Sequence, residues 1–248
     1  VLPLPRRITE RPGRTVVFAS GATTAGPTAP VIETSPAIRA LFQRLLTRRL
    51  EELGSGAPSA RTDYAVPVQF LKDPDLDVPE AVRRPENFAE QGYVLDISSQ
   101  EVICHAQTDN GLLNGFSTLL QLMSVETGSG SPEAGKVTLP HCLITDWPVF
   151  STRYVAEYHI PGDDYLDWMA FYKINGFATS SRAFLWDEPE SFSEPMKSLG
   201  DYIKAHRTIS HLVQIHIGGR GGKVLDAGNN GDIEKLQRAI RIAVERGA

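Results

Sequence analysis

The sequence has 248 residues, of which 41% are hydrophobic and 22% are charged, and its formal net charge is −5. This composition is close to that of an average soluble globular protein, and the length allows two modest domains. The mild negative charge argues against a nucleic-acid partner, because such a protein needs a concentrated basic face. No run of about 18 apolar residues occurs, so the sequence predicts no membrane-spanning segment and no membrane partner.

The two cysteines, Cys104 and Cys142, lie in apolar segments with strand-like composition. No Cys-x-x-Cys pair is present, which argues against a cysteine zinc site. We expect two buried free thiols, and the sequence leaves a disulfide between them open. The chain begins at Val1 and contains no signal-peptide core, which is typical of a processed start, so we expect an extracellular or periplasmic protein.

The first part of the chain alternates strand-like and helical patterns after a lead-in rich in Pro and Arg. Five short segments have the composition of strands: residues 14–20, 65–71, 92–97, 101–106 and 137–144. One helix is predicted from Pro36, since apolar residues recur there at helical spacing, and another is capped by Asp109 or Asn110. Residues 72–91 are charged and contain Pro, so a loop is predicted. This order predicts an α+β domain over residues 1–146, an antiparallel sheet with helices on one face.

After residue 146 the chain changes to a regular alternation of strand and helix. The predicted strands are residues 153–160, 177–184 and 211–217. The predicted helices are residues 163–174, 194–206 and 232–245. Asp163 and Asp164 are next to each other like a catalytic carboxylate pair, but they directly precede an apolar helical stripe, so helix capping explains them better. Three successive βα units predict a parallel sheet, so residues 147–248 form a second, α/β domain.

Two stretches resemble glycoside hydrolases that act on N-acetylated amino sugars. The sequence DNGLLNGFSTLLQLM at residues 109–123 is followed by DWPVF at residues 146–150. In this order the two phrases resemble the end of the accessory domain of bacterial β-hexosaminidases of family 20 and of O-GlcNAcase-type enzymes of family 84. The sequence FYKIN at residues 171–175 is similar to the phrase that ends the first barrel helix in both families. The resemblance implies that residues 147–248 are the first three βα units of a TIM (β/α)₈ barrel, completed by the same or another chain.

The resemblance also implies an activity. It implies hydrolysis of a terminal N-acetylhexosamine, with β-linked N-acetylglucosamine as the expected sugar, on a glycan or glycoconjugate. Family 20 enzymes use a substrate-assisted retaining mechanism, in which the acetamido oxygen of the substrate attacks the anomeric carbon. An acidic pair after the fourth barrel strand would orient the acetamide and protonate the leaving group. That pair would lie beyond Ala248, so we assign no catalytic residue, no cofactor and no metal within this sequence.

Barrel active sites lie at the carboxyl ends of the strands, and this rule selects candidate substrate-binding residues. They are Glu157, Tyr158, His159, Arg182 and His216. The resemblance to family 84 places Arg182 where those enzymes carry a substrate-binding lysine, and a guanidinium there suits an oxygen-rich ligand. Glu157 could instead form an ion pair with Arg153 or Arg182. Trp186 is the tryptophan nearest to the end of a predicted strand, where it could stack on a sugar.

Two other functions remain open from the sequence. A carbohydrate-binding module on the same scaffold would bind glycans without turnover. A metal-dependent barrel hydrolase would use His159 and His216, but no third ligand is spaced to join them. The sequence GGRGGK at residues 218–223 differs from a phosphate-binding P-loop, because Val224 follows the lysine and the next predicted helix begins several residues later.

Overall fold

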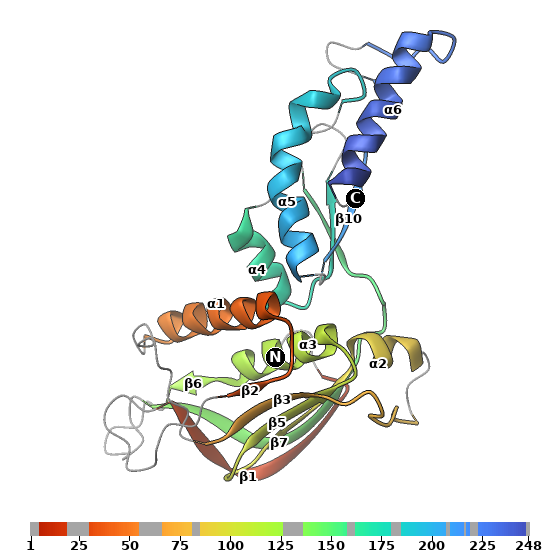
Figure 1. The fold of residues 1–248 in the computed structure, drawn as a ribbon. Coiled ribbons are helices and arrows are strands. Elements are labelled where there is room, and N and C mark those ends of the chain that lie inside the picture. Colours follow the sequence, from red (N-terminus) through yellow and green to blue (C-terminus); the bar gives the residue numbers. More distant parts are fainter. Residues whose placement is uncertain are drawn as a thin grey trace. The chain divides into compact units, whose positions relative to one another are not determined.

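The computed structural model describes residues 5–18, 30–54, 66–80, 85–125, 136–157, 162–179, 185–206, 209–215, 217–218 and 223–246 (Figure 1). The chain forms two compact units. Unit 1 contains residues 1–151 and 171–173, and unit 2 contains residues 152–170 and 174–248. The chain therefore leaves unit 1 twice, and the second departure follows the three-residue segment 171–173.

A mixed sheet is the centre of unit 1, with the strand order β1-β7-β4-β5-β3-β2 and β6 beside β7. The strands are β1 (Arg7–Phe18), β2 (Val31–Ile32), β3 (Val68–Lys72), β4 (Tyr93–Ile97), β5 (Val102–Ala106), β6 (Ser124–Val125) and β7 (Val137–Asp146). Strands β1, β7, β4 and β5 pair antiparallel, whereas β3 pairs parallel with both β5 and β2. The prediction of a purely antiparallel sheet is therefore wrong. The helix between β2 and β3 is a crossover connection, so the chain enters β3 in the same direction as β2 and the two strands pair parallel.

Helices α1 (Pro36–Glu52) and α3 (Asp109–Leu122) lie on one face of this sheet, as the sequence predicts (Figure 1). Phe42 of α1 stacks on Phe116 of α3 at 4.1 Å between ring centroids, and Phe70 of β3 meets both rings edge-on. Burial of each ring contributes about 2–3 kcal/mol. Thr108 caps α3 by accepting a hydrogen bond from the Gly111 amide, one residue before the predicted caps.

Several parts of unit 1 have regular structure where the sequence predicts none: the first half of β1, the short strands β2 and β6, and helix α2 (Pro85–Gln91). Strand β1 begins at Arg7, seven residues before the predicted strand at residues 14–20, and it contains an irregularity between Glu10 and Arg14. Its exposed charged side chains hide the alternation of a strand, and they protect the open edge of the sheet. Helix α2 lies in the predicted loop, because a seven-residue helix is too short to show a helical period.

The two cysteines of unit 1 are both free and buried. Burial raises the pKa of the Cys104 thiol, so this side chain stays protonated and packs as a small apolar group. The structure thus answers the question of a disulfide that the sequence leaves open. Within the described part of the chain, no helix is both long and apolar enough to cross a membrane.

Unit 2 contains three parallel strands in the order β10-β9-β8. They are β8 (Tyr154–Glu157), β9 (Gly176–Thr179) and β10 (Ser210–Val213), and they alternate with helices α4 (Asp163–Phe171), α5 (Ser193–His206) and α6 (Asn230–Glu245). A short 3₁₀ helix, η1 (Pro189–Phe192), directly precedes α5. This order confirms the three predicted βα units. Three units do not make a (β/α)₈ barrel, so the barrel itself stays a prediction.

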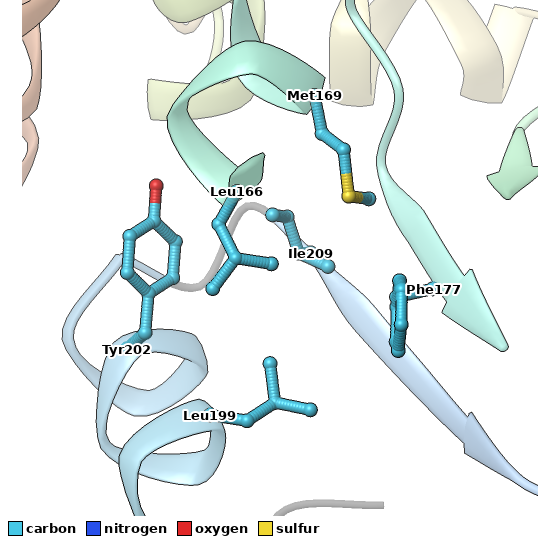
Figure 2. Close-up of a cluster of buried hydrophobic side chains, with 6 residues drawn as sticks. All are labelled: Leu166, Met169, Phe177, Leu199, Tyr202 and Ile209. Carbon is cyan, nitrogen blue, oxygen red and sulfur yellow. The ribbon is translucent and has the colours of Figure 1, made fainter. Parts of the chain in front are cut away.

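Buried side chains from α4, α5, β9 and the residue before β10 form a core of unit 2 (Figure 2). They are Leu166, Met169, Phe177, Leu199, Tyr202 and Ile209. Tyr202 also donates a hydrogen bond to the buried Asp167 carboxylate at 2.7 Å, which joins α5 to α4. This core holds both helices against the same face of the sheet.

Candidate functional site

The carboxyl ends of β8, β9 and β10 meet at one edge of the parallel sheet. Thr179 of β9 is the register partner of both Glu157 and Val213, the last residues of the flanking strands. We call the edge defined by these three residues the carboxyl edge. In βα folds the loops that follow the strands gather at this edge, and binding sites form there.

Of the five predicted substrate-binding residues, the structure describes only the backbone of one, and this backbone lies at the carboxyl edge. Glu157 is the last residue of β8. Its side chain and the residues Tyr158, His159, Arg182 and His216 lie outside the described residues. Their roles in substrate binding therefore stay predictions. Among the side chains that the structure describes, no group of three or more His, Cys, Asp or Glu could hold a metal ion.

A buried pair of polar residues lies beside the carboxyl edge. Thr179 is fully buried, His211 is 7% exposed, and the Thr179 Oγ1 atom lies 2.7 Å from His211 Nε2. The Nδ1 atom of His211 has no hydrogen-bond partner among the described residues. Burial lowers the pKa of His211 to about 4, so the imidazole is neutral near pH 7. This histidine packs against Phe177 in the core, and we assign it a structural role.

Lys223 joins the loop after β10 to the loop after β9. Its ammonium lies 4.7 Å from the ring centroid of Trp186, a cation–π distance, and 3.1 Å from Asp232 Oδ1 at the start of α6. Desolvation opposes ionisation of Asp232, but hydrogen bonds from Lys223 and the Asp226 amide outweigh it and lower the pKa of the carboxyl. Lys223 thus links the two loops through its contact with Trp186, and its charge is paired with Asp232.

Near the contact between Lys223 and Trp186, two polar atoms are buried without a hydrogen-bond partner among the described residues. They are Trp186 Nε1 and Asp187 Oδ1. Trp186 is fully buried, so its ring does not offer an open face to a sugar, contrary to the stacking role considered from the sequence. Buried polar atoms left without partners are uncommon, and they concentrate at functional or strained sites. Both atoms lie in the loop after β9, so this loop is part of the candidate site.

Sequence reasoning did not select Lys223 as a residue of the candidate site, although it placed residues 218–223 in the loop after the third predicted strand. Its neighbours, residues 218–222, attract attention only as a phosphate-loop-like run of glycines. The signal that could have identified it is positional, because a cation between a predicted strand and the next predicted helix must lie in a βα loop. Its partner Trp186 lies in the preceding βα loop, and such loops lie side by side when their strands are neighbours.

The family of the chain follows from its first domain. Residues 1–147, more than half of the sequence, match the model for glycosyl hydrolase family 20, domain 2. The chain belongs to this family. This match confirms the resemblance to family 20 that the sequence analysis drew for the first domain. Among curated proteins, none matches the chain in sequence.

The likeness to solved structures extends over the whole of this chain. One is a family 20 exo-β-N-acetylglucosaminidase from Vibrio harveyi, with 15% identity and a TM-score of 0.68, of which the chain covers 45%. A β-N-acetylhexosaminidase from Bacteroides fragilis has 17% identity and a TM-score of 0.67, and the chain covers 55% of it. CpGH84B has 17% identity and a TM-score of 0.63, with 42% covered. In all three cases the likeness covers 100% of the chain, which spans about half the length of these proteins.

Proposed function

We propose that this chain is the amino-terminal part of a glycoside hydrolase that removes terminal N-acetylhexosamine, with β-linked N-acetylglucosamine as its substrate. The observation that carries the proposal is the order of the domains. A family 20 accessory domain is followed directly by three parallel βα units. Enzymes whose names describe this activity have the same fold over the full length of the chain.

Exposed apolar side chains of unit 2 support completion of a barrel by further βα units. Leu212 of the edge strand β10 is 49% exposed, and Ile240 and Val244 of α6 are 47% and 64% exposed. Parallel sheets are normally covered on both faces, and an amphipathic helix normally buries its apolar stripe. We propose that further βα units, from a longer chain or a partner, cover these side chains in the complete protein.

In this proposal the carboxyl edge binds the terminal sugar, and the acidic pair follows the fourth barrel strand. The substrate's acetamido oxygen is the nucleophile, so the protein must orient the acetamide and protonate the leaving group. Glu157, Tyr158, His159, Arg182 and His216 would contact the sugar hydroxyls. The extracellular or periplasmic location also stays a prediction.

Arg182 is the residue at which this assignment is tested. In the complete protein, Arg182→Ala should lower kcat/KM for 4-nitrophenyl N-acetyl-β-glucosaminide by about tenfold or more, because a charge-assisted hydrogen bond to the substrate is lost. Arg39→Ala is a suitable control, since Arg39 lies on α1 and its guanidinium bonds the Ile32 carbonyl within unit 1. Unchanged kinetics for Arg182→Ala would remove this residue from the site.

A further inference from the structure

Two segments of unit 1 lead directly into strands of unit 2. Residues 147–151 precede β8, which begins at Tyr154, and residues 171–173 precede β9, which begins at Gly176. Both segments pack within unit 1, although the chain on their carboxyl side belongs to unit 2. We call them the first and second lead-in segments.

The second lead-in segment is held by a buried ion pair. Lys173 is 5% exposed, and its ammonium lies 3.0 Å from Asp146 Oδ2 and 3.0 Å from the Tyr93 hydroxyl. Burial, followed by the nearby Asp146 carboxylate, holds the pKa of Tyr93 well above its usual value, so the phenol stays protonated and donates to Asp146. A buried charge is retained only when it is paired and hydrogen-bonded, and all these partners belong to the sheet of unit 1.

The backbone of Lys173 shows that this position is imposed. Its φ angle is 60°, and it is the one non-glycine residue with positive φ among the described residues. Such a conformation is uncommon for a residue with a long side chain, and it persists where the surroundings determine it. Gln121 of α3 adds a hydrogen bond to the Phe171 carbonyl at 2.9 Å. Side chain and backbone of the second lead-in segment are thus both fixed.

Buried amide side chains of α2 hold the first lead-in segment by its backbone. Asn87 donates to the carbonyls of Pro148 and Val149 at 3.3 and 3.0 Å, and Gln91 donates to the carbonyl of Ser151 at 2.6 Å. Asn87 and Gln91 are 2% and 1% exposed. A buried amide that bonds backbone carbonyls fixes the path of the chain whatever side chains that segment carries.

We propose that unit 1 sets the register of the first two strands of unit 2, and that Lys173 is the positioning residue of this device. Strands β8 and β9 pair from Tyr154 opposite Gly176, so their register depends on where each lead-in segment ends. The Arg153 amide donates to Asn175 Oδ1, and the Gly176 amide donates to the Arg153 carbonyl, which starts the pairing at that point. This role goes beyond the proposed hydrolase activity and does not depend on which sugar is bound.

Hydrogen exchange measured by mass spectrometry on the complete protein tests the role of Lys173. In Lys173→Met, amides of residues 154–157 and 176–179 should exchange about tenfold faster or more, while those of β4 and β5 keep their wild-type rates. Lys72→Met is the matched control, because it removes an exposed ion pair of unit 1, with Asp109 at 2.8 Å. The control should change neither set of strands. Unchanged exchange in β8 and β9, or an equal rise in β4 and β5, would overturn the proposal.

A second variant separates positioning from the simple cost of an unpaired charge. In Lys173→Met/Asp146→Asn no buried charge is left without a partner, so exchange in β8 and β9 should return to the wild-type rate if the unpaired Asp146 charge alone caused the change in Lys173→Met. If Lys173 positions the strands, amide exchange in β8 and β9 should stay faster than in the wild-type protein in the double variant. If the Lys173 variants do not fold, Gln121→Leu decides, because it removes a side-chain hydrogen bond to the Phe171 carbonyl. A selective rise in the exchange of β9 then supports the proposal, and no rise overturns it.

Discussion

Acidification should destabilise unit 2 through His211. The pKa of this side chain falls from 6.5 to about 4 on folding, because burial disfavours the imidazolium. Between these values the unfolded chain binds a proton that the folded chain does not. Stability is therefore complete above pH 6.5 and is lost as the pH falls toward 4. The shift corresponds to a loss of about 2.5 kcal/mol between pH 7.5 and pH 4.5.

Urea unfolding at the two pH values, followed by tryptophan fluorescence, measures this loss, since Trp168 and Trp186 both belong to unit 2. Other groups titrate over the same range, so the comparison is made with His211→Gln. Its amide can still bond Thr179 but cannot gain a proton. The wild-type protein should lose about 2.5 kcal/mol more than the variant between the two pH values. Parallel pH profiles for the two proteins would refute the reasoning.

Three further substitutions test the packing of each unit. Phe116→Ala should lower the free energy of unfolding of unit 1 by about 3–5 kcal/mol in a denaturant titration, because it empties the centre of the aromatic cluster. Gly115→Ala should also lower the stability of unit 1, although alanine favours helices, because its Cβ would clash with Cys104 Sγ. A higher Tm for this variant would contradict the prediction. Lys223→Met should lower the stability of unit 2 by about 1 kcal/mol through loss of the cation–π contact with Trp186. An unchanged Trp186 emission spectrum in that variant would argue against the contact.

Local patterns were sufficient to predict most of the fold. The apolar stripe of α3 and the alternation after residue 146 each depend on neighbours a few positions apart, and both were confirmed. The parallel pairing of β3 depends on residues far apart in sequence, so no local pattern indicates it. The predicted strand at residues 14–20 omits the first half of β1. Arg7 and Glu10 face solvent at a sheet edge, where polar residues replace the alternating pattern of a strand.

The candidate site was predicted less completely than the fold. Strand ends can be located from sequence, and Glu157 lies at one of them. The contact between Lys223 and Trp186 depends on the paths of two loops, which no periodicity encodes. Lys173 attracted attention only as part of a family phrase, and its burial against Asp146 explains physically why a lysine suits that position. Burial of a charged residue is decided by its partners, which lie far away in the sequence.

The most direct test of the proposed activity compares two chromogenic substrates on the complete protein. One is 4-nitrophenyl N-acetyl-β-glucosaminide, and the other is 4-nitrophenyl β-glucoside, which lacks the acetamido group. A substrate-assisted mechanism predicts a kcat/KM at least about 100-fold higher for the first, because only that substrate carries the internal nucleophile. Equal hydrolysis of both substrates would contradict the mechanism. Binding of the N-acetylated sugar without any hydrolysis would contradict the enzyme assignment and favour a carbohydrate-binding module.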